Sequence, residues 1–461
     1  MYRKKQHIHF VGIGGIGMSG IAEVLINLGH HVSGSDLRET EITRRLAGLG
    51  AAVSYGHRVE NVAEADVVVI SSAVNPQNPE VIAARERFIP VIPRAEMLAE
   101  LMRLKTAVAV AGSHGKTTTT SLLGTILAAA GLDPTLVIGG KLDSIGSNAR
   151  LGGGEFLVAE ADESDGSFLL LSPTLAVVTN IDLEHLDYYR DLDHLKETFL
   201  AFINRVPFYG VAVLCLDDPN VQSLIPRLKK RYLSYGFSTQ ADIRAEHVVL
   251  EGLTSRYQLV FKGEALGPIR LGLPGLHNVL NSLAAAGAAL ELEVPFEAVA
   301  AGLGHVGVIQ RRFERKGEAG GVLLIDDYGH HPTEIAATLA TLKTCYPDRR
   351  AVVLFQPHRY TRTRALLQEF TQAFNQADRL VVTEIYAAGE APIAGVSGEA
   401  LYEAVRAHGH RDVRFEPEVE RLPARVVPDL VPGDVVLTLG AGSISSIGRE
   451  ILRMLRNEAG A

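Results

Sequence analysis

The chain has 461 residues, more than one hydrophobic core normally organises, so we expect two to four domains. Its 47% apolar and 21% charged residues are typical of a soluble globular protein, and its net charge of −8, without any Lys/Arg-rich block, argues against nucleic acid or an acidic membrane as the main partner. We therefore expect small ligands. The two cysteines favour neither a disulfide framework nor a zinc site and fit a reducing cytoplasm, and because no stretch of about 18 apolar residues is present, we expect no membrane span.

The first block of the chain predicts a parallel sheet. Residues 8–36 indicate a strand, a glycine turn, a helix and a second strand, and residues 65–74 indicate a further strand. Gly12, Gly14 and Gly17 form G-x-G-x-x-G in the turn, where backbone N–H groups can approach a pyrophosphate. Asp36 ends the second strand, where a carboxylate can accept a hydrogen bond from a ribose hydroxyl. A turn whose glycines serve only packing is the alternative.

A second block begins with a strand at 106–112, a loop and a helix at 117–132. Gly115, Lys116 and Thr117 in this loop can supply backbone donors, a positive charge for phosphates and a hydroxyl for Mg²⁺. The strict phosphate-loop pattern fails, because Val110 stands five positions before Gly115. A helix capped by Ser113 with an incidental lysine is therefore the alternative.

Two later strands of this block end in polar clusters. Strands at 155–162 and 174–182 lead into carboxylates, an amide and an imidazole, which suit a hard divalent cation bridged to phosphate. Solvated acidic loops are the alternative. The block continues with a helix at 192–206, a strand at 210–218, β-like residues 241–263 and a helix at 275–292 that carries His277, Asn278 and Asn281. The polar cluster at the end of the strand at 155–162 contains Glu160, Asp162, Glu163 and Asp165, and the one at the end of the strand at 174–182 contains Asn180, Asp182, Glu184, His185 and Asp187.

The third block starts near Arg311 and again alternates strands and helices, with strands expected at 321–329, 351–358, 377–385, 412–417 and 434–442. Residues 326–335 place two carboxylates and two histidines before a helix that Pro332 can start. Another strand is followed by His358, Arg359, Arg362 and Arg364, and such arginines can hold a carboxylate or phosphate. Solvated loops are the alternative for both clusters, and the glycine turn at 440–443 is equally compatible with a structural or a ligand-contacting role.

Taken in order, these motifs resemble those of the Mur ligase family over essentially the whole chain. The matching segments are GIGGIGMSGIA, GSHGKTTTT, EADESDGSF, TNIDLEHLD, GLHNVLNSLAA, RRFE, DDYGHHPTEI and FQPHRYTRT. The resemblance implies an α/β chain of three domains: a Rossmann-like UDP-sugar domain at 1–103, a central P-loop-type ATPase domain with a mostly parallel sheet at 104–308, and a Rossmann-like C-terminal domain at 309–461 that closes over the site. It also implies cytoplasmic ligation of L-alanine to the lactyl carboxylate of UDP-N-acetylmuramate, in peptidoglycan precursor biosynthesis, with ATP, Mg²⁺ or Mn²⁺ and an acyl-phosphate intermediate. A ligase that adds a preformed tripeptide to the same UDP-sugar is the alternative, although Tyr328 and Gly329 favour the alanine reaction.

The same resemblance assigns roles to individual residues. It leaves open which histidine is the general base, and we expect a monomer or a weak homodimer. The pattern departs from the family at Ser443, at Glu184 and at an apparent extra residue before the arginine pair. The implied ATP site is Gly112, Ser113, His114, Gly115, Lys116, Thr117, Thr118, His277, Asn278, Asn281, Arg312 and Asp327; the UDP-sugar site is Gly12, Gly14, Gly15, Gly17, Asp36, His57, Ser71 and Ser72; the metal ligands are Thr117, Glu160 and His185; the amino-acid site is Tyr328, His330, Arg359 and Arg362; and the catalytic set is Lys116, His330, His358, Arg359 and Arg362.

Overall fold

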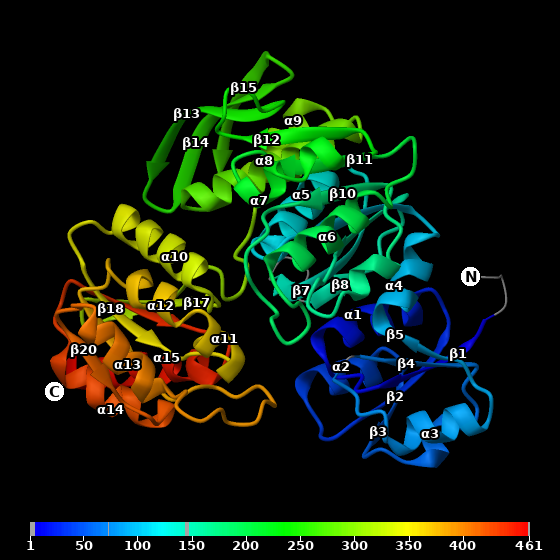
Figure 1. Ribbon diagram of the computed structural model, residues 1–461, viewed down its shortest axis with the longest axis horizontal. Helices are drawn as coiled ribbons and strands as arrows, with labels where there is room; N and C mark the ends of the chain where they lie inside the picture. Colours follow the sequence, from blue (N-terminus) through cyan, green and yellow to red (C-terminus); the bar gives the residue numbers. More distant parts are fainter. Residues whose placement is uncertain (1–4, 72, 143–146, 460–461) are drawn as a thin grey trace.

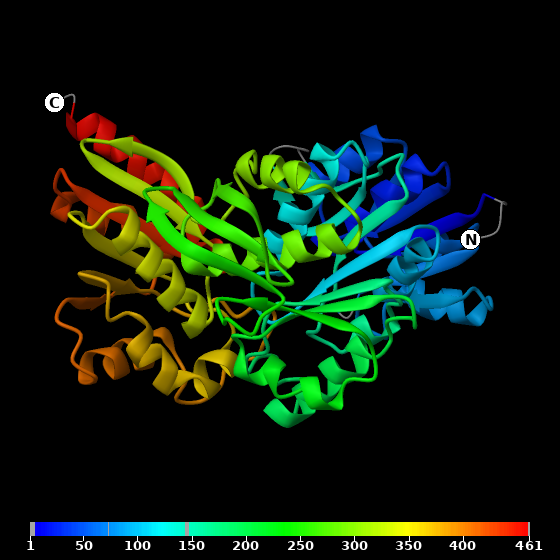
Figure 2. The ribbon, with the colours of Figure 1, turned by 90° about the horizontal axis from the view of Figure 1, so that it is seen from above.

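The computed structural model describes residues 5–71, 73–142 and 147–459, which form three α/β units in series (Figure 1). The central unit, cyan to green, lies between the N-terminal unit, blue, and the C-terminal unit, yellow to red, and the view from above shows the same order (Figure 2). The predicted α/β architecture of three domains is confirmed. In the described part of the chain, no helix combines the length and apolarity that crossing a bilayer requires.

The N-terminal unit contains a five-stranded parallel sheet in the order β3-β2-β1-β4-β5. The chain order reverses between β1 and β4, and ligands of open α/β sheets bind in the crevice beyond the carboxyl ends of strands at such a point. The predicted glycine turn follows β1 directly, so it lies at this crevice. The elements are β1 (His7–Val11), α1 (Ile16–Asn27), β2 (His31–Asp36), α2 (Glu41–Gly48), β3 (Ala52–Tyr55), β4 (Val67–Ile70), α3 (Pro79–Glu86), β5 (Val91–Pro93) and α4 (Arg94–Met102).

The central unit has a ten-stranded sheet whose middle is parallel and whose two ends are antiparallel. The alanine-rich helix α8 (Leu276–Glu291) is buried, and its small side chains allow close packing against α5 (Lys116–Ala129) and the sheet. The sheet order is β15-β14-β13-β12-β11-β10-β6-β9-β7-β8. The strands are β6 (Thr106–Ala111), β7 (Thr135–Leu142), β8 (Ser147–Arg150), β9 (Phe156–Glu160), β10 (Leu175–Val178), β11 (Val211–Cys215), β12 (Tyr232–Gly236), β13 (Ile243–Glu251), β14 (Thr254–Phe261) and β15 (Glu264–Leu271), and the other helices are α6 (Leu192–Ile203), α7 (Pro219–Gln222) and α9 (Phe296–Gly304).

The C-terminal unit has a six-stranded sheet in the order β16-β17-β21-β18-β19-β20, parallel except for β16 at one edge. Helix α10 begins at Pro332, as predicted. The elements are β16 (Glu314–Ala319), β17 (Val322–Asp327), α10 (Pro332–Cys345), β18 (Arg350–Phe355), α11 (Tyr360–Ala365), α12 (Leu367–Ala373), β19 (Arg379–Val382), α13 (Gly398–Ala407), β20 (Val413–Phe415), α14 (Leu422–Val426), β21 (Asp434–Leu439) and α15 (Gly448–Ala459).

The sequence did not predict strands β3, β5, β7, β8, β12, β15 and β16. Two glycines interrupt the apolar run of β7, a proline lies within β15, and β16 carries four charged residues among six. Strands β8, β15 and β16 end their sheets, where charged residues and proline are tolerated because one edge has no partner strand. Edge strands therefore lack the continuous apolar pattern that marks the buried strands.

Candidate active site

The loop between β6 and α5 is held in shape by the segment that follows β10. Gly115 and Gly112 both have positive φ, +83° and +132°, and a Cβ on Gly112 would lie 2.0 Å from Thr179 Oγ1. The backbone N–H of His114 donates to Asn180 Oδ1 (2.8 Å), and Ser113 N–H donates to Asn180 O (3.0 Å). The loop is thus anchored through its backbone at the start of an α-helix, where free N–H groups favour an anion.

All four threonines after Lys116 are buried in α5. Thr119 Oγ1 donates to Asn281 Oδ1 (3.3 Å), and an added Cβ on Gly115 would lie 2.4 Å from the same oxygen. Asn281 of α8 therefore touches the loop directly. Asn278, in contrast, donates to Pro274 O (2.7 Å) and accepts from Asn281, so its amide also serves the start of α8.

Lys116 forms an ion pair with a buried acidic residue that follows β9. Its Nζ lies 2.9 Å from Glu163 Oε1 and also donates to Gly112 O and Ser113 O. The Glu163 side chain is only 1% exposed. Burial lowers the pKa of Lys116, but the attraction of Glu163 outweighs burial and the net pKa is raised, so the lysine is charged.

A group of three potential metal ligands lies next to this pair. Glu163, Glu184 and His185 offer ligand atoms within 4.8 Å of one another, and Glu163 Oε2 is buried without a hydrogen-bond partner in the described chain. Carboxylate oxygens of this kind suit a divalent cation. The expected ligand Glu160 ends β9 and is half-buried, outside this group, which shares only His185 with the predicted set of Thr117, Glu160 and His185; that set stays a prediction. The sequence did not single out Glu163 among the carboxylates of its strand end, because that strand end offers several of them.

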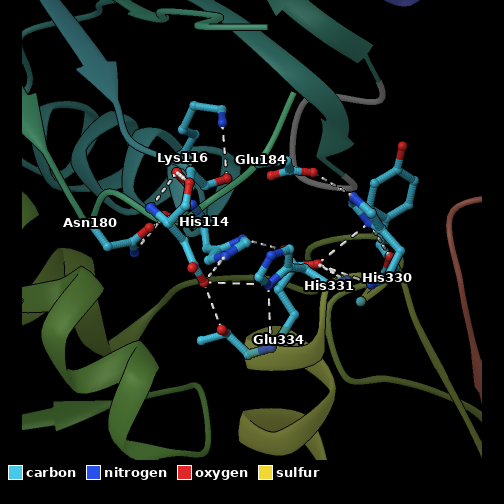
Figure 3. A network of polar contacts seen from close by, with 12 residues as sticks. His114, Lys116, Asn180, Glu184, His330, His331 and Glu334 are labelled. Atoms are coloured by element: carbon cyan, nitrogen blue, oxygen red, sulfur yellow. Dashed lines mark hydrogen bonds and ion pairs between the residues drawn. The ribbon is translucent and has the colours of Figure 1, made fainter. Parts of the chain in front are cut away.

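The loop between β6 and α5 also contacts the C-terminal unit (Figure 3). His114 Nε2 lies 3.1 Å from Asp182 Oδ2 in the central unit, and its Nδ1 lies 3.3 Å from Glu334 Oε1 in α10. Burial lowers the pKa of His114, but the two carboxylates outweigh burial and raise it to about 10, so the ring is protonated. His331 and Thr333 reach Asp182 from the same helix start, at 3.4 Å and 2.6 Å.

The histidines and arginines predicted in the third block meet the acidic strand end of the central unit. Arg362 donates to Glu184, and His330 Nε2 lies 3.5 Å from the same carboxylate. The rings of His330 and His358 lie 5.7 Å apart. Burial, His330 and nearby arginines lower the pKa of His358 to about 3, so it is neutral. Arg359, in the left-handed region with φ +71°, pairs outside this cluster with Asp187 at 3.1 Å.

The linker into the third unit is ordered by Asp327 and Tyr328. Arg311 and Arg312 lie over the Tyr328 ring at 4.8 Å and 5.3 Å. Asp327 is buried and accepts from the backbone N–H groups of Phe313 (2.7 Å) and Gly329 (2.7 Å). These contacts give Asp327 a structural role, while its ATP contact stays a prediction. His277 is half-buried at the start of α8, and burial lowers its pKa to about 4.

The predicted UDP-sugar residues gather around the glycine turn. The backbone N–H of Gly14 donates to Asp36 Oδ2 (2.9 Å), and Gly12 takes φ +78°. His57 Nδ1 lies 3.0 Å from Ser35 Oγ and 3.2 Å from Glu80 Oε2, so these two side chains hold the orientation of its ring. Gly15 immediately precedes α1, Gly17 lies in its first turn, and Ser71 follows β4; Ser72 lies outside the described residues.

Two further residues at the N-terminal crevice carry no motif in the sequence. Glu80 is fully buried, and although burial raises its pKa, the His9 ring at 3.7 Å and hydrogen bonds from Ser35 and Asn61 lower it to about 2. Arg94 lies against Gly17, because a Cβ there would be 2.0 Å from its Nη1, and it donates to Asp162 of the central unit at 3.0 Å. A charged residue immediately after a proline is too common a signal to mark either position.

Comparison with known proteins extends over all three units. The family descriptions that match are "Mur ligase family, catalytic domain" at residues 7–106, "Mur ligase middle domain" at 110–289 and "Mur ligase, glutamate ligase domain" at 311–442. The UDP-N-acetylmuramate–L-alanine ligase of Syntrophobacter fumaroxidans is 61% identical, with 100% of this chain and 98% of that protein covered, and that of Geobacter sp. strain M21 is 59% identical, with 99% of each covered.

Solved structures agree. The UDP-N-acetylmuramate-alanine ligase MurC of Thermotoga maritima has a TM-score of 0.82 and 29% identity, with 99% of this chain and 100% of that chain covered. The murein peptide ligase of Psychrobacter arcticus shares the fold, with a TM-score of 0.72 and 24% identity over 98% of this chain and 99% of that one. The alignment of three family domains with three structural units, together with these relatives, shows that the chain belongs to the Mur ligase family.

Proposed function

We propose that the protein uses ATP to join L-alanine to the lactyl carboxylate of UDP-N-acetylmuramate. The relatives at about 60% identity over nearly the whole chain are named UDP-N-acetylmuramate–L-alanine ligases. The observation that carries the proposal is that Lys116 and the acidic strand ends of the central unit meet His330 and Arg362 of the C-terminal unit around Glu163 and Glu184. Groups that can neutralise phosphate and groups that can hold a carboxylate thus share one site.

The reaction proceeds in two steps. A lactyl carboxylate oxygen attacks the γ-phosphorus of ATP, the bond between that phosphorus and the ADP oxygen breaks, and an acyl phosphate forms. The amine of L-alanine then attacks the acyl carbonyl carbon, the nitrogen loses a proton, and the carbon–oxygen bond to phosphate breaks to release inorganic phosphate. A carboxylate that approaches a polyphosphate is repelled, so the site must supply positive charge and hold the reactants in line.

The residues of this chain divide that work. We assign Lys116 and the backbone N–H groups of residues 112–118 to the ATP phosphates. His330, Arg359 and Arg362 are assigned to the alanine and the reacting carboxylate, and His330 or the neutral His358 to the proton of the amine. A divalent cation, when bound, would neutralise phosphate charge, and the residues that would hold it are His185, Glu163 and Glu184 of the structural group with the predicted Thr117 and Glu160.

The remaining predicted residues complete the substrate sites. We propose domain boundaries at 1–103, 104–308 and 309–461, with the UDP-sugar at the glycine turn of the first domain. Adenosine then lies by α8 and the linker, and the C-terminal domain encloses the amino acid next to Tyr328. The UDP-sugar set is Gly12, Gly14, Gly15, Gly17, Asp36, His57 and Ser71, and the adenosine set is His277, Asn278, Asn281, Arg312 and Asp327.

The test is an acceptor comparison. Purified protein is incubated with ATP, Mg²⁺ and UDP-N-acetylmuramate, and phosphate release is measured after addition of L-alanine or of the tripeptide. We expect release with L-alanine. Release with tripeptide alone would assign the recycling reaction instead, and release with neither would contradict the ligase assignment.

A further inference from the structure

Glu334 contacts both the nucleotide loop and a candidate catalytic histidine. It is the third residue of α10, and its side chain is 13% exposed. One carboxylate oxygen, Oε1, lies 3.3 Å from His114 Nδ1 and 3.9 Å from Arg312. The other, Oε2, accepts from the backbone N–H of His330 (3.0 Å) and lies 3.4 Å from His330 Nδ1. Figure 3 shows these contacts converging on α10 from the loop and from His330.

The two oxygens do different work. Oε2 caps α10, because it also accepts from the N–H of His331, the residue before the helix. A capping box requires only Glu or Gln at this position, so the cap alone does not need a charge. Oε1 points away from the helix to the ring of His114, whose other nitrogen faces Asp182. The negative charge of Glu334 therefore serves contacts beyond its own helix.

We propose that Glu334 is a positioning residue that couples the ATP loop to the amino-acid histidine across the boundary between the central and C-terminal units. Asn180 anchors the loop backbone within the central unit. The His114 side chain instead contacts both units, through Asp182 of the central unit and Glu334 of the C-terminal unit. The same carboxylate sets the backbone and ring of His330. Docking of α10 thus orients the loop and the histidine together. The assignment of His330 to the amino acid rests on the proposed function.

The decisive variant is Glu334→Gln, which keeps the helix cap and removes the charge. We expect it to melt close to wild type and to lower kcat/KM by about tenfold for both ATP and L-alanine, because a charge-assisted contact is lost on each side. Lys343→Gln is the matched control: Lys343 lies in the last turn of α10 and pairs with Asp378 of its own unit, so kcat/KM should stay within about twofold of wild type. A Glu334→Gln enzyme within about twofold of wild type for either substrate would overturn the proposal.

A double-mutant cycle on ADP binding tests the loop contact without any acceptor. If Glu334 acts through His114, His114→Gln and Glu334→Gln should each raise the Kd for ADP. The Kd of the double variant should then lie within about twofold of the higher of the two single-variant values. Multiplying effects would show that the residues act independently and would overturn the coupling. Asp182→Asn removes the contact of the His114 ring with the central unit, so it should weaken ADP binding, but it should lower kcat/KM for L-alanine less than Glu334→Gln does. An equal loss of kcat/KM for L-alanine in the two variants would contradict the proposed coupling. Failure of the wild type to use L-alanine would instead refute the proposed function, since the ADP cycle does not depend on it.

Discussion

Replacement of Lys116 by methionine should remove activity and stability together, and the structure allows the two losses to be separated. Methionine keeps most of the side-chain volume but leaves Glu163, 1% exposed, without its lysine. The His185 ring remains beside it, with Nε2 3.6 Å from Glu163 Oε1. Breaking one side of a buried ion pair costs about 3–5 kcal/mol. For a domain of this size that corresponds to a fall in melting temperature of roughly 6–20 °C.

The assay pairs melting in EDTA, which removes any bound cation, with phosphate release in Mg²⁺. We expect Lys116→Met to melt early and to release no phosphate. In Lys116→Met/Glu163→Gln the buried charge is gone, so most of the stability should return while turnover stays absent. A single variant that melts like wild type would refute the reasoning about the buried pair. Turnover near wild type in either variant would remove the loop from the mechanism.

Three further predictions concern the N-terminal crevice, α8 and the interface. Gly14→Ala places a Cβ 2.7 Å from Asp36 Oδ2, so the KM for UDP-N-acetylmuramate should rise several-fold with the KM for ATP unchanged; a rise in both would argue against a separate UDP-sugar site. Burial lowers the pKa of His277 in the folded protein to about 4, below the ordinary 6.5, so the neutral ring stabilises the fold above pH 6.5 and this contribution is lost as the pH falls towards 4. Between pH 7.5 and pH 5, the melting temperature of His277→Gln should therefore fall less than that of wild type. An equal fall in both proteins would contradict the assignment. Arg362→Ala leaves the buried Glu184 without its arginine, so kcat/KM for L-alanine should fall at least tenfold, with ADP affinity nearly unchanged; normal kinetics would exclude Arg362 from the site.

Local features of the site were predictable because they depend on residues close in sequence. The turn at Gly115 needs a residue that tolerates positive φ, and the apolar strand before it and the helix after it are legible within a short window. The same holds for the glycine turn at Gly12, and for α10, which starts at Pro332 where the sequence places it. In each case the backbone geometry follows from the types of a few neighbouring residues.

Contacts between the units were not predictable from local pattern. Glu334 reads as an ordinary acidic residue in the first turn of a helix, and only the packing of α10 against the central unit brings it to His114. Glu163 is one of several carboxylates after β9, and burial next to Lys116 distinguishes it from Glu160. Arg94 meets Gly17 and Asp162 only because two units are joined there.

By itself, the sequence determined the α/β class, the three-unit order and the chemical character of each strand end, because apolar periodicity, glycine placement and capping act over a turn of helix or a single strand. Tertiary structure decided which carboxylate partners which cation. Buried ion pairs form only where the desolvation of both charges is offset by close geometry, and that geometry depends on how separate sheets pack. The individual segments of the site therefore follow from local sequence. The ion pairs that Glu163, Glu184 and Glu334 form between these segments depend on how the folded units pack together.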